Sequence, residues 1–298
     1  MKTVKDFNFK NKKAIIRVDF NVPLNANFEV TDATRIQAAK PTIIEILEQG
    51  GSCVLMSHLG RPKGFQDAFS LRHIVKSIEA IIGCNVKFIE DCIGEKVEEA
   101  VANLEAGEIL LLENLRFYEE EKKGEIAFAE KLSKFGDIYV NDAFGTAHRA
   151  HASTTIIAQF FEGNKCFGNL LAREIESIDK VLNNSEKPVL AILGGAKVSS
   201  KITVIENILD KVDHLIIGGG MSFTFVKALG GKIGNSICED DKMELALDIL
   251  KQAKAKGVEI HIPVDVIAAD DFSNDANTQV LDINEIPDGW EGVDAGPK

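Results

Sequence analysis

The sequence has few cysteines, and none of them lies in a pattern typical of a bridge or a metal site. Their number is odd, their spacing is wide, and no C-x-x-C pair occurs. This excludes a disulfide framework and a zinc ribbon, and favours reduced thiols in a cytosolic protein. The five are Cys53, Cys84, Cys92, Cys166 and Cys238.

Long apolar runs are also missing. No run approaches the roughly 18 residues that a membrane-spanning helix needs. The first ten residues, "MKTVKDFNFK", contain no apolar segment typical of a secretory signal. We therefore expect a soluble, cytoplasmic protein that has no membrane partner.

Positive charge is in deficit, because the net charge is −12 and the pI is near 5.1. So acidic a chain is a poor candidate for binding nucleic acid through phosphate neutralisation. Any local cluster of arginine and histidine runs against this overall charge and is therefore informative. A length of 298 residues exceeds one ordinary hydrophobic core and predicts two domains.

Short apolar runs alternate with longer amphipathic stretches, such as 34–49 and 240–255. Most of the runs are apolar at every position, as expected for strands covered on both faces. The alternation predicts an α/β protein with two Rossmann-like parallel-sheet domains. The expected strands are 14–18, 53–56, 86–89, 109–112, 138–140, 189–193, 215–218 and 259–264.

A domain boundary is expected within 165–188. The stretch "LLAREIESIDKVLNN" is amphipathic throughout and predicts one helix, and Pro188 then opens a new apolar strand. We predict a first domain over 1–168, a connecting helix over 169–187 and a second domain over 188–298.

Polar residues follow four strands of the first domain, where each expected strand ends. Ligands bind beyond the carboxyl ends of parallel strands, so these residues are expected to converge. Arginine suits carboxylate and phosphate, and Asp or Asn can hold hydroxyls. The pattern predicts a site for a small, multiply anionic molecule. Its members are Asp19, Asn21, Arg35, His58, Arg61, Arg116 and Arg149.

Other interpretations of these residues remain open. Each arginine could be a surface residue paired with a nearby acid. His148 and His151 could bind a metal on a helix, although no third ligand is evident and Arg149 would repel a cation. The acidic segment 270–284 lacks the glycine and glutamate of a calcium-binding loop, and a solvated loop or edge strand is the better prediction.

Two glycine turns characterise the second half. "LAILGGAKVSSKI" and "LIIGGGMSFTF" each place glycines between a strand and a helix. Such turns allow close backbone approach, and helix starts favour phosphate. Lys197 and Lys201 are four apart, which predicts that they share one helical face. A nucleotide site is indicated, although neither turn fits the P-loop or dinucleotide pattern and simple tight turns remain the alternative.

A polyanion site in one domain and a nucleotide site in the other suggest phosphoryl transfer across a cleft. Domain closure would exclude water and prevent hydrolysis of the donor. Aligned reactants and cationic stabilisation supply most of what this chemistry needs.

The motifs "RVDFNVPL", "DATRI", "SHLGRPKG", "LLENLRF", "VNDAFGTAHRAHAST", "GGAKVSSKI" and "GGGMSFTF" resemble those of phosphoglycerate kinase, in the same order and spacing. The resemblance covers essentially the whole chain. It implies a glycolytic kinase with a carboxyl acceptor, which reversibly converts 1,3-bisphosphoglycerate and ADP into 3-phosphoglycerate and ATP. It also implies Mg²⁺ bound with the nucleotide, with no metal ligand taken from the chain, and a monomer that bends at a hinge.

The resemblance also implies roles for particular residues. Arg35 and Lys197 would be catalytic, with Lys197 stabilising the transferring phosphoryl group. Phosphoglycerate would contact Asp19, Phe20, Asn21, Arg35, His58, Leu59, Gly60, Arg61, Arg116 and Arg149. The nucleotide would contact Gly194, Gly195, Lys197, Lys201, Gly218, Gly219, Gly220 and Gly292.

The sequence departs from the family at its end, because it stops at "VDAGPK" where family members continue. We therefore expect an incomplete second domain, and a chain that binds phosphoglycerate with little or no turnover. Two further hypotheses are a non-catalytic metabolite-binding fragment and an NAD-dependent dehydrogenase. The second is disfavoured because the dinucleotide motif is missing.

Overall fold

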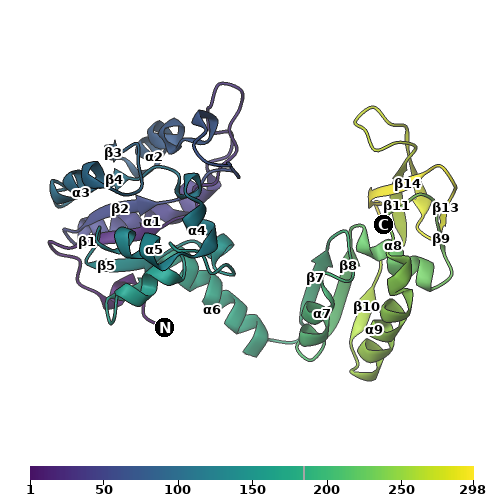
Figure 1. The fold of residues 1–298 in the computed structure, drawn as a ribbon. Helices are drawn as coiled ribbons and strands as arrows, with labels where there is room; N and C mark the ends of the chain where they lie inside the picture. Colours follow the sequence, from purple (N-terminus) through teal and green to yellow (C-terminus); the bar gives the residue numbers. More distant parts are fainter. Residues whose placement is uncertain (184) are drawn as a thin grey trace. The chain divides into compact units, whose positions relative to one another are not determined.

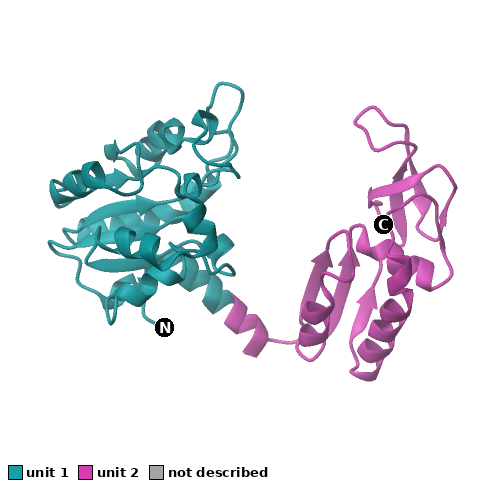
Figure 2. Ribbon diagram, in the orientation of Figure 1, with its two compact units in different colours: residues 1–177 teal, residues 178–298 magenta. Residues whose placement is uncertain are grey.

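The computed structural model describes residues 1–183 and 185–298 (Figure 1). The chain forms two compact units, residues 1–177 and residues 178–298 (Figure 2). The division falls inside helix α6, Asn169–Asn183, which the amphipathic stretch after residue 165 predicted.

Unit 1 is built on a six-stranded, wholly parallel sheet in the order β3-β4-β2-β1-β5-β6. Five of its strands were predicted from apolar runs. The sixth was not, because it has only three residues and only its central cysteine is buried. The strands are β1 Lys13–Arg17, β2 Ser52–Met56, β3 Val86–Phe88, β4 Ile109–Leu111, β5 Ile138–Asn141 and β6 Lys165–Phe167.

Both faces of this sheet are covered. Ala14 and Ile16 of β1 pack into a core cluster with α1 and α2, whereas Ile15 packs into a second cluster with α3 and α5. Burial on both sides explains why these strands are apolar at every position. The helices of this unit are α1 Thr34–Glu48, α2 Val75–Ile82, α3 Glu95–Ala102, α4 Glu119–Lys123 and α5 Ile126–Ser133. Short 3₁₀ turns are η1 Val4–Asp6, η2 Asp67–Phe69, η3 Leu71–Ile74, η4 Leu115–Phe117, η5 Phe144–Thr146 and η6 Ile156–Phe160.

The register of the sheet brings its polar loops together. Arg17, the last residue of β1, pairs with Met56 of β2 and with Asn141 of β5. All three strands therefore end at the same level. The loops that follow them, beginning near Asp19, Ser57 and Asp142, start from one edge of the sheet.

Unit 2 contains a second parallel sheet in the order β10-β8-β7. A single core cluster joins this sheet to its helices, with Ile205 of α7 and Ile249 of α9 fully buried in it. The elements are β7 Leu190–Gly194, α7 Ile202–Ile208, β8 His214–Gly218, α8 Met221–Ala228, η7 Asp240–Lys242, α9 Met243–Ala255 and β10 Glu259–His261.

The rest of unit 2 is a three-stranded antiparallel sheet, β12-β11-β14, and a two-stranded pair, β13-β9. The apolar run 259–264 predicted one strand, but the strand ends at His261, because Pro263 cannot donate to a ladder. The predicted edge strand within 270–284 is confirmed as β12. Trp290 packs against the core under this sheet. The strands are β9 Lys232–Ile233, β11 Asp265–Ala269, β12 Thr278–Asp282, β13 Glu285–Ile286 and β14 Glu291–Ala295.

Within residues 1–183 and 185–298, no helix is both long and apolar enough to cross a membrane.

Candidate active site

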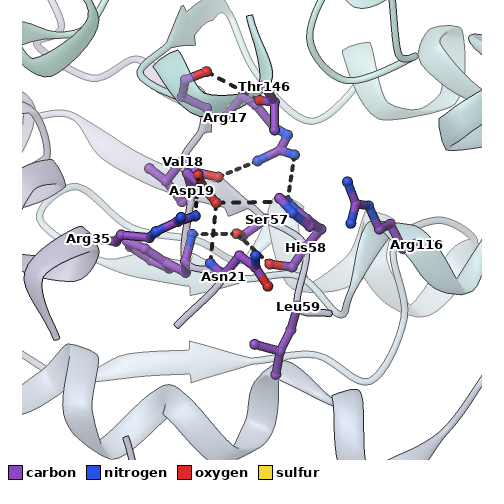
Figure 3. A network of polar contacts seen from close by, with 12 residues as sticks. Arg17, Val18, Asp19, Asn21, Arg35, Ser57, His58, Leu59, Arg116 and Thr146 are labelled. Carbon is purple, nitrogen blue, oxygen red and sulfur yellow. Dashed lines mark hydrogen bonds and ion pairs between the residues drawn. The ribbon is translucent and has the colours of Figure 1, made fainter. Parts of the chain in front are cut away.

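Asp19 is the meeting point of three elements of unit 1 (Figure 3). It lies in the loop after β1, and its Oδ2 accepts a hydrogen bond of 2.6 Å from Nη1 of Arg35 in the first turn of α1. Its Oδ1 lies 4.0 Å from Nδ1 of His58, which follows β2. The backbone N–H of Asn21 also donates to Oδ1, at 3.3 Å. Asp19 therefore holds the guanidinium of Arg35 and the backbone of Asn21 at the carboxyl end of the sheet, with the imidazole of His58 close by.

Gly60 joins two further predicted residues. Its N–H donates to Oδ1 of Asn21 at 2.8 Å, and its carbonyl accepts from Nη1 of Arg116 at 2.7 Å. Its φ is +62°, and a Cβ at this position would lie 2.3 Å from the ring of Phe69. Only glycine satisfies both constraints.

Phe20 and Leu59 are buried in the core of unit 1. The N–H of Phe20 donates to Oγ of Ser57 at 2.8 Å, and the carbonyl of Leu59 accepts from Nδ2 of Asn114 at 2.8 Å. Their side chains thus anchor the loops, and any contact with a ligand must come from their backbone.

Arg17 belongs to this site and was missed from the sequence. It is 1% exposed, and its Nε donates to Oγ of Ser153 at 2.8 Å. Its Nη2 donates to Nδ1 of His58 at 3.1 Å (Figure 3). Ser153 in turn donates to Oε1 of Glu121 at 2.6 Å. The sequence feature that could have identified Arg17 is its place in the apolar run "AIIRV". A charged side chain buried with such a run requires hydrogen-bond or charge partners.

The electrostatics follow from this crowding of cations. Burial and the nearby guanidiniums of Arg17, Arg116 and Arg35 lower the pKa of His58 to about 2, so its imidazole is neutral near pH 7. Because Nδ1 accepts from Arg17, the proton is on Nε2, which remains available as a donor. Burial also lowers the pKa of Arg116, and the charges of Arg149, Arg17 and Arg61 act in the same direction.

Of the remaining predicted cations, Arg35, Arg61 and Arg149 are exposed, whereas Arg116 is buried. Within the described residues, Arg61, Arg116 and Arg149 form no ion pair with a carboxylate, whereas Arg35 pairs with Asp19. This removes the interpretation of these three as surface arginines neutralised by acids. Their charges are free to meet an anion.

The loop 143–154 is small and cationic but well anchored. Nε of Arg149 donates to Nε2 of His148 at 3.1 Å, which occupies the lone pair that a metal would need. His151 lies 3.8 Å from Oε1 of Glu121. The hydroxyl of Tyr139 donates to the carbonyl of Ser153 at 2.9 Å. His148 thus accepts a hydrogen bond from Arg149, and His151 lies beside the carboxylate of Glu121.

The two glycine turns of unit 2 lie against each other. Gly194 and Gly218 pair at the ends of β7 and β8, and the N–H of Met221 donates to the carbonyl of Gly195 at 2.7 Å. Gly219 has a φ of +66°, and a Cβ there would lie 3.1 Å from the nitrogen of Gly195. Gly219 is therefore required by its backbone conformation and close approach, whereas a Cβ at Gly218 would meet nothing within 4 Å.

The expectation that Lys197 and Lys201 share a helical face is wrong. Helix α7 begins at Ile202, so Lys201 is its N-cap and Lys197 lies in the preceding loop. The serines between them bind elsewhere: Ser200 Oγ donates to the carbonyl of Lys197 at 2.8 Å, and Ser199 donates to Glu239. Serines that bond in this way compete with helix formation.

Gly292 lies beside the second glycine turn. Together with Gly219 and Gly220 it lines a pocket of about 110 Å³ in unit 2. A Cβ on Gly292 would lie 2.2 Å from the ring of Phe223, so packing alone requires glycine here. Its N–H donates to Oγ of Ser236 at 2.9 Å.

Comparison with known proteins gives one consistent result. The chain matches the phosphoglycerate kinase family over residues 4–298. It is 50% identical to the phosphoglycerate kinase of Porphyromonas gingivalis, over 99% of this chain and 77% of that protein. It is also 50% identical to the cytosolic phosphoglycerate kinase of Nicotiana tabacum, over 99% of this chain and 73% of that protein.

A solved structure has the same fold. The phosphoglycerate kinase of Coxiella burnetii superposes with a TM-score of 0.81 at 38% identity, covering 99% of this chain and 74% of that one. The family match excludes the hypothesis of an NAD-dependent dehydrogenase. From its sequence and from its fold, the chain belongs to the phosphoglycerate kinase family.

Proposed function

We propose that the chain reversibly transfers a phosphoryl group between 1,3-bisphosphoglycerate and ADP, giving 3-phosphoglycerate and ATP. One observation carries the proposal: Arg61, Arg116 and Arg149 follow strand ends of one sheet edge and, among the described residues, lack a carboxylate partner. Such unneutralised guanidiniums fit a ligand with both a carboxylate and a phosphate.

We assign the phosphoglycerate to unit 1. The free arginines would neutralise its charges, and Asn21 and neutral His58 would hold its hydroxyl or ester oxygens through hydrogen bonds. The acceptor carboxylate is already ionised near neutral pH, so no general base is required. This agrees with a site in which the imidazole has too low a pKa to take up a proton.

We assign the nucleotide to unit 2. The N–H groups of the turns 194–195 and 218–220 would approach its phosphates, and the pocket beside Gly292 would take part of the base or ribose. Mg²⁺ enters as part of the nucleotide substrate and offsets the charge of its phosphates. Lys201 is placed to contact the phosphates, because its side chain passes Gly195, with Cε 3.8 Å from a Cβ built there.

Catalysis in this proposal is electrostatic. Three equatorial oxygens of a loose transition state carry the charge, and cations that are already in position lower its energy. Arg35 is held by Asp19 before any ligand binds, and Lys197 is exposed on the loop after β7. These two residues would touch the transferring group. We propose further that the chain acts as a cytoplasmic monomer; the tobacco relative is named as cytosolic.

Titration of the full chain with 3-phosphoglycerate and with Mg-ADP, followed by a linked-enzyme assay of ATP consumption, tests the proposal. We expect saturable binding of both ligands and 3-phosphoglycerate-dependent turnover. Binding of 3-phosphoglycerate without Mg-ADP binding or turnover would instead favour a metabolite-binding fragment.

A further inference from the structure

Three metal-ligand side chains meet on the parallel sheet of unit 2, away from the glycine turns. His214 is the first residue of β8, and Glu259 and His261 begin and end β10. The parallel register pairs His214 with Glu259. Residues two apart on a strand point to the same face, so His261 joins the pair.

The three ligand atoms form a single triangle. Nδ1 of His214 lies 3.1 Å from Nε2 of His261 and 3.3 Å from Oε2 of Glu259, and the last two atoms are 3.8 Å apart. Zinc bonds of about 2.0–2.1 Å in a tetrahedron require ligand atoms about 3.3 Å apart. The triangle therefore already has close to the dimensions of one face of a zinc tetrahedron. Among the described residues, these three make up the one group of at least three such side chains close enough to hold an ion.

The surroundings permit a cation to bind. The three side chains are 38%, 67% and 43% exposed, in chain order, so an ion can reach them from solvent and a water can take the fourth position. Lys187, which lies near the start of this sheet, is paired with Asp213, the residue before His214, at 2.8 Å. In the metal-free chain the two imidazoles stack, with ring centroids 5.3 Å apart, and Nδ1 of His214 and Nε2 of His261 are within hydrogen-bond distance. To bind a metal ion, both nitrogens must present a lone pair, so the ring that donates here takes its other tautomer.

We propose that His214, Glu259 and His261 bind one Zn²⁺ ion, with water as the fourth ligand. The ion links β8 to β10 at the amino end of β8. Gly218, which begins the second glycine turn, is four residues further along the strand, about 13 Å away. The ion therefore stabilises unit 2 and takes no part in the transfer reaction.

Calorimetric titration of the chelator-treated full chain with Zn²⁺ tests the site. We expect one ion per chain, and a loss of affinity of more than about 100-fold in His214→Ala or His261→Ala, since even indirect partners of a metal ligand are worth 10–100-fold. Glu259→Gln should lose about 10-fold or more. The matched control Glu285→Gln, an exposed carboxylate of the same unit, should bind as the parent chain does.

Two further measurements show whether the ion is bound by these three residues or elsewhere on the chain. Co²⁺ should give the intense visible absorption of a tetrahedral site in the parent chain and lose it in Glu259→Gln, which leaves the fold intact. Zn²⁺ should raise the melting temperature of the parent chain, without any rise in His214→Ala/His261→Ala. The proposal is overturned if the parent chain does not bind Zn²⁺, or if the double variant binds it as well as the parent chain. It is also overturned if His148→Ala, a substitution in unit 1, abolishes Zn²⁺ binding instead. These outcomes do not depend on the result of the kinase assay.

Discussion

At the scale of single residues, the site depends on cations that lack acidic partners. Arg116 donates to the carbonyl of Gly60, a neutral group, although it is mostly buried among other guanidiniums. A carbonyl holds the side chain in place without neutralising it. The arrangement keeps positive charge available for a ligand in a chain whose net charge is −12.

Arg116→Ala should weaken binding of 3-phosphoglycerate by about 10- to 100-fold, since a hydrogen bond to a charged group is worth about 1.5–3 kcal/mol. Calorimetric titration measures the change, and Mg-ADP affinity should be unaltered. Arg72→Ala is the matched control, because Arg72 in the same unit is already paired with Asp67. Equal affinities for the two variants would contradict the role given to Arg116.

His58 should make unit 1 sensitive to acid. Its folded pKa of about 2 lies below its ordinary value of 6.5, so the unfolded chain binds a proton that the folded chain does not. Stability is therefore full above pH 6.5 and is lost progressively as the pH falls below it. Between pH 7 and pH 5 the loss from this residue is about 2 kcal/mol.

Urea unfolding followed by circular dichroism at the two pH values measures that loss. His58→Asn should lose about 2 kcal/mol less than the parent chain over this interval, even if it is less stable at pH 7. Identical pH dependence for both would mean that His58 is protonated in the folded chain.

At the scale of elements, the loop between β7 and α7 separates two lysines that a helix would have aligned. Lys197 is exposed in the loop, whereas Lys201 caps the helix with its side chain next to Gly195. Because their environments differ, we expect the two lysines to differ in their contributions to turnover and to Mg-ADP binding.

We therefore expect Lys197→Ala to lower kcat strongly, by about 100-fold or more, with little change in Mg-ADP affinity, because its interaction develops in the transition state. Lys201→Ala should mainly weaken Mg-ADP binding. Steady-state kinetics and nucleotide titration of both variants, with Lys211→Ala as control, measure these effects. Near-normal turnover of Lys197→Ala would refute its assignment.

The sequence predicts an element well when burial is two-sided. Apolar runs such as 109–112 identified strands of the unit 1 sheet, which is buried on both faces. The run 189–193 also identified β7, but the expected two-sided burial is wrong there, because Leu190 and Ile192 are 53% and 68% exposed. Other antiparallel strands were missed: β14, "EGVDA", is mostly exposed and carries no such run. Arg17 was missed because its partners, His58 and Ser153, are 41 and 136 residues away. Strand-end residues were predictable, whereas the buried contacts behind them depend on tertiary structure.

At the scale of the whole molecule, each unit has its own core and its own set of candidate ligand contacts. We expect each ligand to protect its own unit in hydrogen exchange. 3-Phosphoglycerate should slow exchange in the loops after β1 and β5, and Mg-ADP should slow it at 194–201 and 218–223, because bound ligands suppress local opening.

Mass spectrometry of the exchanged full chain checks this pattern. Arg116→Ala serves as control, since 3-phosphoglycerate should no longer protect unit 1 while Mg-ADP still protects unit 2. Protection of the glycine turns by 3-phosphoglycerate alone would contradict the assignment of ligands to units.

Trp290 is the sole tryptophan of the sequence, and it packs in unit 2, whereas both tyrosines, Tyr118 and Tyr139, belong to unit 1. The two halves are thus labelled by different chromophores without any added dye. Indole emission excited at the red edge of the absorption band follows one half only, and the phenol signal comes from the other. A single unmodified sample can therefore report, in real time, which half responds first when a ligand is mixed in.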